Sequence, residues 1–361
     1  MKWLAAFLVA GSLVFAYRPY EFVSLGSRAT GIGAAGGVVL ASPESIVYNP
    51  AALSRLTVSE LFYEAYATIR IERIETFHYY VSFDSVYFLG YTMPIKDTTW
   101  TFAASIATLF QGISDDTKKL WYKQLGVSAS FSPLPWLALG ITAGPVVGIH
   151  NQDGLNGTSV AISAGGSAGV LVNPLPSWLM GLSFIAPVHL QWKSYYGSSV
   201  VDEIMPYAVR FGNSYMFTPE LTGFFDLEYQ GWHLSSWTGD GITEKRDANG
   251  AVFVIGKDIH PHFGVEFYDR NAIAKNYGGG IYRLGLFSRS AFTRTGNYES
   301  RWQISLGTTI FAGKFIRISG SMLDSWIIEQ FVQTGYAAIE EFRFTIEINT
   351  DILAGAKATA S

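Results

Sequence analysis

The chain of 361 residues contains no cysteine, and charged residues make up only 15% of it. Without cysteine it has no disulfides, no thiolate metal sites and no cysteine-linked lipid anchor. The formal net charge is −4. A chain that binds phosphate backbones carries a basic face, so this composition argues against a nucleic-acid partner.

A long apolar run is also missing from most of the chain. A membrane-spanning helix needs about 20 consecutive apolar residues, and no segment after Ala16 supplies them. Aromatic residues, in contrast, make up 15% of the chain, and there are 37 glycines. This mixture is unusual for a soluble enzyme and typical of a β-barrel that turns aromatic side chains toward lipid.

The first 16 residues have the features of a removable export signal. Lys2 precedes an apolar run from Leu4 to Phe15, and Val14 and Ala16 provide the small, uncharged positions that signal peptidase accepts. We therefore expect residues 1–16 to be a signal peptide that is cleaved after Ala16, and an exported mature protein.

Period-two alternation dominates the remainder of the chain. Near its end, Phe342, Phe344 and Ile346 alternate with Arg343 and Glu347, which predicts a strand with one apolar and one polar face. In lipid, alternating strands satisfy all backbone hydrogen bonds only by closing into a barrel. The same alternation predicts polar side chains that line the lumen: Arg70, Glu72, Arg210, Asp226, Glu228, Arg301, Arg317, Arg343 and Glu347.

Strand lengths of about 10 residues predict roughly 14 strands in an all-β transmembrane antiparallel barrel over residues 57–350. A C-terminal tail, residues 351–361, would follow. The pattern offers sixteen candidate strands, of which two should be false or lie in loops; they include 76–84, 86–94, 178–192 and 251–258. Polar stretches such as 195–202 would form outer loops.

Several tryptophans fall at predicted strand ends: Trp100, Trp136, Trp178, Trp192 and Trp232. An amphipathic indole suits headgroup depth, so we expect an interfacial girdle. The alternative is a soluble β-sandwich with tryptophans at its edges, which would need a second sheet to cover many apolar strand faces.

A glycine-rich segment lies between the signal and the first strand. Gly31, Gly33 and Gly36 match the spacing of a dinucleotide-binding loop, but that loop follows a buried strand and precedes an acidic residue by about 20 positions. Neither condition holds here. We interpret the glycines as positions where the backbone passes tightly against a wall.

The triplet Asn49, Pro50 and Ala51 follows this segment. Proline fixes φ and keeps the preceding residue out of the helical region, while an asparagine amide bonds to nearby backbone. The triplet therefore predicts a rigid corner. It would be either the end of a plug inside the barrel or a simple turn before the first strand.

These two elements resemble the N-terminal plug of the FadL-type outer membrane transporters of hydrophobic compounds. The resemblance rests on Gly26, Arg28, Ala29, Gly31, Gly33 and Ala34, followed by Asn49, Pro50 and Ala51. It implies a plug over residues 17–56 that blocks the lumen on its periplasmic side. In that family an apolar substrate enters the lumen and leaves sideways, through a gap where a strand is kinked, after the plug shifts.

Other chemistry is weakly indicated. His260, Pro261 and His262, with Glu266 and Asp269 nearby, lack the ligand set of a metal site. No nucleophile elbow is present. We expect no catalytic residues, no metal and no cofactor.

The sequence thus predicts an outer membrane transporter for hydrophobic or amphipathic, fatty-acid-like molecules, with membrane lipid and an apolar substrate as partners. Two alternatives stay open. One is a non-transporting barrel that acts with secretion machinery, as in PorV-like relatives, because the region from His262 to Tyr268 resembles theirs. The other is a general porin or structural barrel, because a lumen lined by both signs of charge suits a polar solute at least as well as an acyl chain.

Overall fold

The computed structural model describes residues 21–22, 26–73, 77–111, 118–152, 158–195, 199–231, 234–239, 242–245, 259–270, 280–292, 298–313, 315–324 and 337–350. The expected signal peptide, its cleavage site and the tail 351–361 lie outside these residues, as do Trp232 and the candidate strand 251–258.

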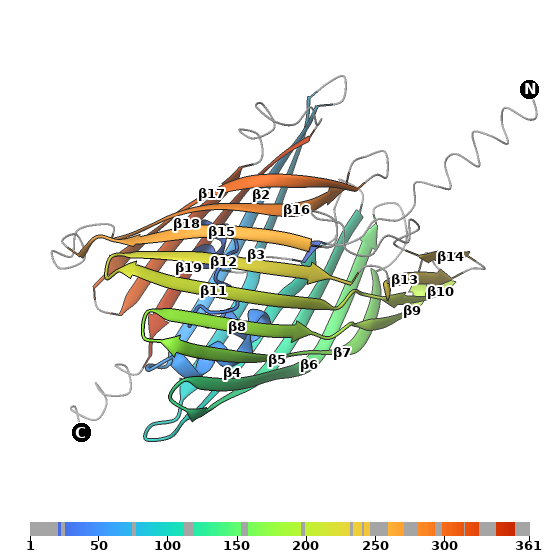
Figure 1. The fold of residues 1–361 in the computed structure, drawn as a ribbon. Coiled ribbons are helices and arrows are strands. Elements are labelled where there is room, and N and C mark those ends of the chain that lie inside the picture. Colours follow the sequence, from blue (N-terminus) through green and yellow to red (C-terminus); the bar gives the residue numbers. More distant parts are fainter. Residues whose placement is uncertain are drawn as a thin grey trace, which may run out of the picture.

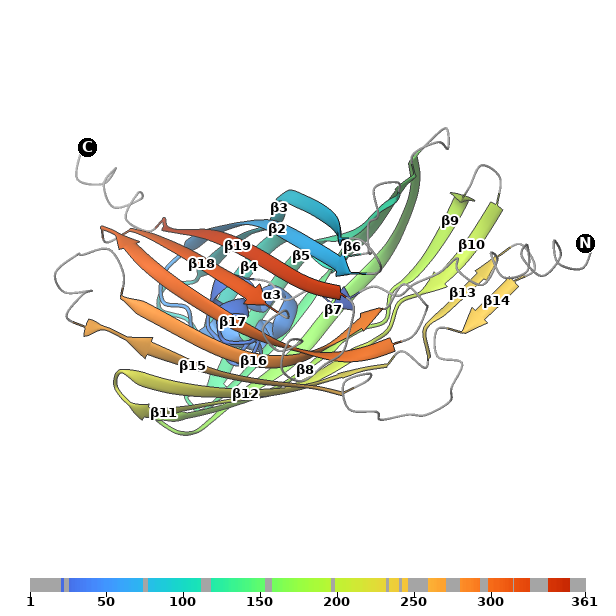
Figure 2. The same ribbon diagram turned by 90° about the horizontal axis from the view of Figure 1, so that it is seen from above.

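Fourteen strands of the described chain close into one antiparallel barrel (Figures 1 and 2). They are β2 (Glu60–Arg73), β3 (Phe77–Pro94), β4 (Trp100–Gln111), β5 (Lys118–Leu134), β6 (Leu137–Gln152), β7 (Thr158–Leu175), β8 (Trp178–Ile185), β11 (Ala208–Thr218), β12 (Leu221–Gln230), β15 (Ile259–Tyr268), β16 (Ile281–Phe292), β17 (Tyr298–Ala312), β18 (Ile316–Asp324) and β19 (Ala337–Asn349). Each pairs with the next one in this order, and β19 pairs with β2 to close the wall. The predicted fold class and strand number are confirmed.

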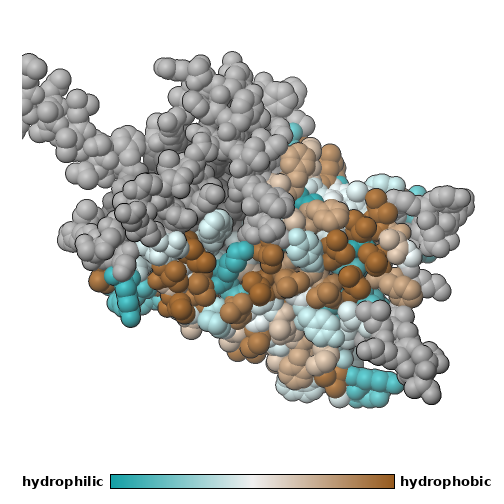
Figure 3. All heavy atoms as spheres, turned by 180° about the vertical axis from the view of Figure 1, so that it is seen from behind, coloured by the Kyte–Doolittle hydropathy of each residue, from teal (hydrophilic) through white to brown (hydrophobic). Residues whose placement is uncertain are grey.

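The two faces of the wall differ as the alternation predicts. On β19, Phe342 and Phe344 are 40% and 44% exposed, whereas Arg343, Thr345 and Glu347 are buried. Apolar side chains form large patches on the described part of the face seen in Figure 3. An outer face of this kind suits lipid, and the inward polar residues form the lining of the lumen.

Of the sixteen candidate strands, 251–258 lies outside the described residues and two others merge into one, which leaves the fourteen strands of the wall. The segments 76–84 and 86–94 are one strand, β3, and not two; its pairing with β2 shifts register between Glu64 and Tyr66, where extra β3 residues bulge out. The segment 178–192 breaks after Ile185, so that β8 stays in the wall and the chain leaves it.

The departing chain forms a second, four-stranded sheet. It consists of β9 (His189–Tyr195), β10 (Ser199–Ile204), β13 (Ser236–Gly239) and β14 (Ile242–Lys245), in the order β14-β13-β10-β9. The stretch 195–202 was expected to be an outer loop. Its described residues instead belong to the paired strands β9 and β10.

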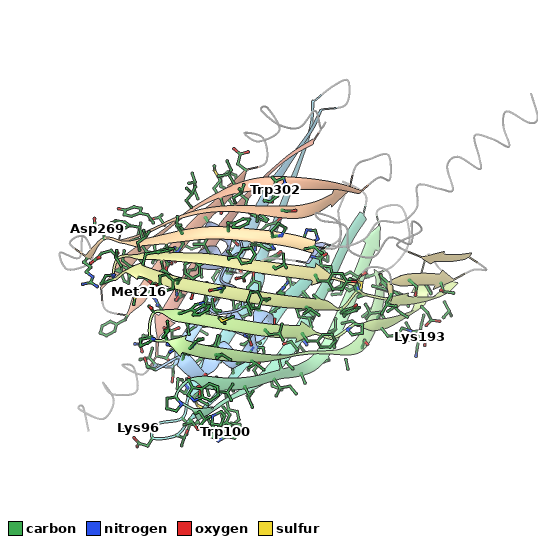
Figure 4. All side chains as sticks on the ribbon, viewed as in Figure 1. Lys96, Trp100, Lys193, Met216, Asp269 and Trp302 are labelled. Atoms are coloured by element: carbon green, nitrogen blue, oxygen red, sulfur yellow. The ribbon has the colours of Figure 1, made fainter. Side chains whose placement is uncertain are left out.

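The barrel has a short-turn end and an opposite end. Two-residue turns at 135–136, 176–177 and 219–220 mark the first. Lys96, Trp100, Met216 and Asp269 lie toward this end in Figure 4, whereas Lys193 lies at the other. Trp100 and Trp136 are 43% and 51% exposed there.

Residues 26–59, which we call the plug, lie inside the barrel. They include α2 (Ser27–Gly31), α3 (Ser45–Tyr48) and the 3-10 helix η1 (Pro50–Arg55), followed by the start of β2. Among the described residues, no helix has the length and apolar character that crossing a membrane requires. The plug is almost wholly buried from Gly26 to Leu53.

Neighbouring strands part at two places toward the end opposite the short turns. β3 pairs with β2 from Phe77 but with β4 only from Phe88 onward. The short strand β1 (Glu21–Phe22) pairs with the last two residues of β4. β7 pairs with β8 only from Ser167 onward, because the chain leaves the wall after β8.

Charge on the outer face of β19 should be costly. Replacing Phe344 by arginine is expected to destabilise the folded barrel by about 2–4 kcal/mol if this position lies near mid-membrane depth. Urea unfolding in lipid vesicles measures this difference. Phe344→Leu keeps the face apolar and serves as the control; equal effects of the two variants would mean that Phe344 does not face lipid.

Candidate functional site: the plug and its seat

The corner at Asn49 joins three parts of the structure. Its side-chain Oδ1 accepts a hydrogen bond from the Ala51 amide at 3.1 Å. Its Nδ2 donates to Val38 O at 2.8 Å and to Val170 O of β7 at 3.1 Å. Pro50 begins η1 directly afterwards. The local bond expected of this triplet is present, and the same side chain also ties the plug to itself and to the wall.

The three glycines singled out in the sequence, Gly31, Gly33 and Gly36, lie against the wall. Gly33 and Gly36 have φ angles of 72° and 76°, a region that favours glycine. A Cβ on Gly33 would lie 2.7 Å from Phe263 O, and one on Gly36 would meet the Phe224 ring. A Cβ on Gly31 would lie 3.0 Å from the Cα of Gly307 on β17.

The wall presents glycines of its own at these contacts. Seven strands each supply one inward glycine against which the plug packs, and β12 supplies Phe224. The pairs, taken around the wall from β17 to β6, are Gly307 with Gly31, Gly285 with Gly33, Gly264 with Ile32, Gly212 and Gly181 with Val38, Gly169 with Asn49, and Gly140 with Pro50 and Ala51. We call these seven wall residues the glycine seat. At most of them a Cβ would overlap plug atoms, so the plug backbone approaches the wall more closely than any other residue would permit.

An ionic cluster fixes one end of the plug. Arg28 on α2 donates to both carboxylate oxygens of Glu266, at 2.9 and 2.7 Å, and to the Tyr268 hydroxyl at 3.2 Å. Arg283 donates to the same carboxylate at 2.7 Å. Burial alone would lower the pKa of Arg28, but the charge and hydrogen bonds of Glu266, together with the charges of Tyr268 and Glu347, raise that pKa well above its usual value. The plug arginine is therefore always charged in its site.

Beside this cluster, β2 and β19 hold the first plug residues. The Gly26 amide donates to Glu64 at 2.9 Å, and the Ser27 amide donates to the Thr345 hydroxyl at 3.1 Å. Glu64 also accepts from Arg343 at 3.3 Å. Wall and plug thus share the same carboxylate.

Glu44 is a buried acid on the plug itself. It is 1% exposed. Burial, reinforced by the charge of Glu347, raises the pKa of Glu44 to about 8. Near neutral pH its carboxyl group is therefore largely protonated, which avoids an uncompensated buried charge between plug and wall.

The structure describes six of the nine side chains expected to line the lumen, and it places all six on the inward face. Arg210 pairs with Glu228 at 2.7 Å, and Asp226 accepts from the Val38 amide at 3.3 Å. Arg317 pairs with Glu347 at 2.7 Å and also with Glu60. Arg343 pairs with Glu64 at 3.3 Å. The side chains of Arg70 and Glu72 on β2 and of Arg301 on β17 lie outside what the structure describes.

His262 is a buried histidine of β15 that contacts the plug. Its Nδ1 lies 3.0 Å from Gly33 O, and its ring stacks on Phe287. In the described part of the chain, no three histidine, aspartate or glutamate side chains are grouped for a metal ion. His262 thus contacts the plug beside the glycine seat.

Trp192 departs from the predicted interfacial girdle. It is fully buried, and its indole Nε1 donates to Glu203 at 2.9 Å. The Tyr122 hydroxyl donates to the same oxygen at 2.9 Å. Because the chain leaves the wall after β8, β9 packs its apolar face, Leu190 and Trp192, over the inner side of β5 to β7. The result is a buried aromatic and aliphatic cluster inside the barrel, away from the short-turn end.

Comparisons with known proteins show the same architecture at low sequence identity. No protein-family model matches the chain, and no curated protein matches it. Among solved structures, the toluene transporter TbuX of Ralstonia pickettii aligns with a TM-score of 0.62 and 13% identity, covering 90% of this chain and 97% of that one. The toluene transporter TodX of Pseudomonas putida gives 0.62 and 11%, covering 92% and 98%. A Pseudomonas aeruginosa FadL homologue gives 0.64 and 12%, covering 92% and 99%.

The fold is that of the FadL-type transporters. The resemblance inferred from the glycine-rich segment and the Asn-Pro-Ala corner is thereby supported across the full barrel. The sequence alone did not predict that the glycine seat, Glu266, Arg283 and Glu64 hold the plug. The signal that was available is glycine on the polar face of successive strands, where a small residue has no reason to recur unless something packs against it.

Proposed function

We propose that the chain is an outer membrane transporter for hydrophobic or amphipathic small molecules, and that the plug is its gate. The observation that carries this proposal is an N-terminal segment packed backbone to backbone on the inner wall of a closed barrel with an apolar exterior. Its fold neighbours include two proteins described as toluene transporters and a FadL homologue, which supports the same class of cargo.

The charges of the lumen favour this cargo over a polar solute. Arginines 28, 210, 283, 317 and 343 each pair with a glutamate of the wall. Paired ions contribute little net field to a passing solute. The side chains packed together at β9, Leu190, Trp192 and the neighbouring Val146, are apolar and fully buried. We propose that an uncharged or weakly polar molecule binds there before it passes.

The molecule would leave the lumen sideways through the wall, between β3 and β4 at the end opposite the short turns. The two strands stop pairing beyond Phe88, next to the bulge of β3, and β1 pairs with the end of β4 on the side that β3 leaves. Unpaired backbone is costly in lipid, so a weakly paired place is where a wall opens most easily. Release of β1 together with a shift of the plug would expose this gap.

Uptake by intact cells tests the proposal. Cells that produce the full-length protein should accumulate radiolabelled toluene and decanoate faster than cells with an empty vector, while uptake of a sugar of similar mass stays unchanged. Equal acceleration of the sugar would favour a general porin. No acceleration of any compound, with a large partner retained on purification, would favour the non-transporting role with secretion machinery.

A further inference from the structure

A pocket opens at the short-turn end, between the plug and the wall, and the transport proposal does not use it. Its volume is about 260 Å³, and it is lined by polar residues and by one tryptophan; these include Arg55, Thr57, Ser132, Trp136 and Asn173. Arg55 is the last residue of η1, so it lies where the plug ends and β2 begins. Ala138 and Leu171, both buried on the inner side of β6 and β7, form its floor.

Arg55 is the cation of this pocket. Every other arginine whose side chain the structure describes is ion-paired: Arg28, Arg210, Arg270, Arg283, Arg317 and Arg343. Arg55 makes no hydrogen bond and no ion pair with any described residue. Partial burial without a nearby acid lowers the pKa of Arg55 from its usual value. A guanidinium group presents a fork of donors that fits carboxylate or phosphate oxygens.

The surroundings of the pocket are amphipathic. Trp136 lines the pocket and is 51% exposed, and Leu134, two residues before it, is 43% exposed. Tryptophan and leucine at the end of a barrel strand suit the boundary between headgroups and acyl chains. An anion held by Arg55 would therefore have an apolar surface beside it for a chain.

We propose that this pocket binds the anionic head of an amphiphile, a carboxylate or a phosphate, with an acyl chain laid along Trp136. The head would accept hydrogen bonds from the Arg55 guanidinium inside the pocket. The source of the head is either an acyl carboxylate that has passed the barrel or a membrane phospholipid. The inference does not depend on transport, because a site at this mouth would bind whether or not the plug opens.

Calorimetric titration of the full-length protein in an uncharged maltoside detergent tests this site. Decanoate and dodecyl phosphate are the two anionic probes, and decanol is the matched uncharged probe. Both anions should bind at least tenfold more tightly than decanol. Tighter binding of decanoate identifies a carboxylate cargo as the source, and tighter binding of dodecyl phosphate identifies a lipid headgroup. Equal binding of decanol and decanoate would overturn the proposal.

Three variants assign the binding to the pocket. Arg55→Gln should weaken anion binding about 10-fold to 100-fold, as expected for the loss of a charged hydrogen bond, and Arg55→Lys should retain part of it. Arg270→Gln, which removes an exposed arginine that pairs with Glu220 near the same end, should leave binding unchanged. Because Arg55 contacts no described partner, its variant should melt at the wild-type temperature. Wild-type affinity in Arg55→Gln, or an equal loss in Arg270→Gln, would show that the pocket is not the site.

Discussion

Deleting residues 26–52 should raise the conductance of the protein in a planar bilayer sharply, from a nearly closed baseline to that of an open barrel. The wall closes through strand pairing alone, with β19 on β2, and no strand of the closed ring belongs to the deleted segment. The deleted residues occupy the interior against seven strands of the seat. Removing them should leave a folded barrel with a water-filled lumen.

Two measurements accompany this deletion. Circular dichroism should show unchanged strand content, which separates an open barrel from an unfolded one. The deletion also removes the Arg28 donors from Glu266 and the Gly26 amide from Glu64, so water must replace the plug's donors, and the melting temperature should fall. If the full-length protein already conducts like an open pore and the deletion changes nothing, the segment does not gate the lumen.

The sequence was sufficient to predict the barrel because lipid imposes a simple rule on every strand. Period-two alternation assigns each side chain to one face, and on β19 the assignment of Phe342 to Glu347 is correct residue by residue. The sequence predicts a break between two strands near Ser85, whereas the structure has a bulge within one strand there. A bulge keeps the strand in the ladder while it shifts the register, which alternation cannot distinguish from two strands.

The seat could not be predicted in the same way, because alternation gives the face of a residue and not its height on the wall. Gly264 lies directly opposite Gly285, Gly181 opposite Gly212, and Gly140 opposite Gly169. These pairings depend on the register between strands. Arg28 and Glu266, which are 238 residues apart, likewise meet only in the folded barrel.

Trp192 shows a further limit of local reasoning. Its place at the end of a predicted strand indicated headgroup depth, yet the chain leaves the wall after β8 and carries the residue inward. The segment Ala186, Pro187 and Val188 separates the two strands. Proline there was a signal for the break, since it removes a backbone donor from the ladder.

Replacing Gly285 by alanine should lift the plug from its seat. A Cβ at this position would overlap backbone atoms of Ile32 and Gly33, and backbone cannot turn away as a flexible side chain does. Forcing one extra carbon into a packed interior costs about 1–3 kcal/mol. The strain falls on the contact between plug and wall, because β16 keeps its pairing with β15 and β17. We therefore expect frequent opening events in single-channel recordings and a lower melting temperature.

Gly320→Ala is the matched control for this substitution. It adds the same carbon to a neighbouring part of the same barrel, on β18, where the nearest atom would be Arg343 O at 3.9 Å. Recordings of this variant should match those of the wild type. A second seat variant, Gly140→Ala, overlaps the backbone of Pro50 and Ala51 at the other end of the plug and should open the barrel as well. If Gly285→Ala and Gly140→Ala stay as closed as Gly320→Ala, the plug can move off the wall without opening a path, and the gate would have to be placed where β3 parts from β4.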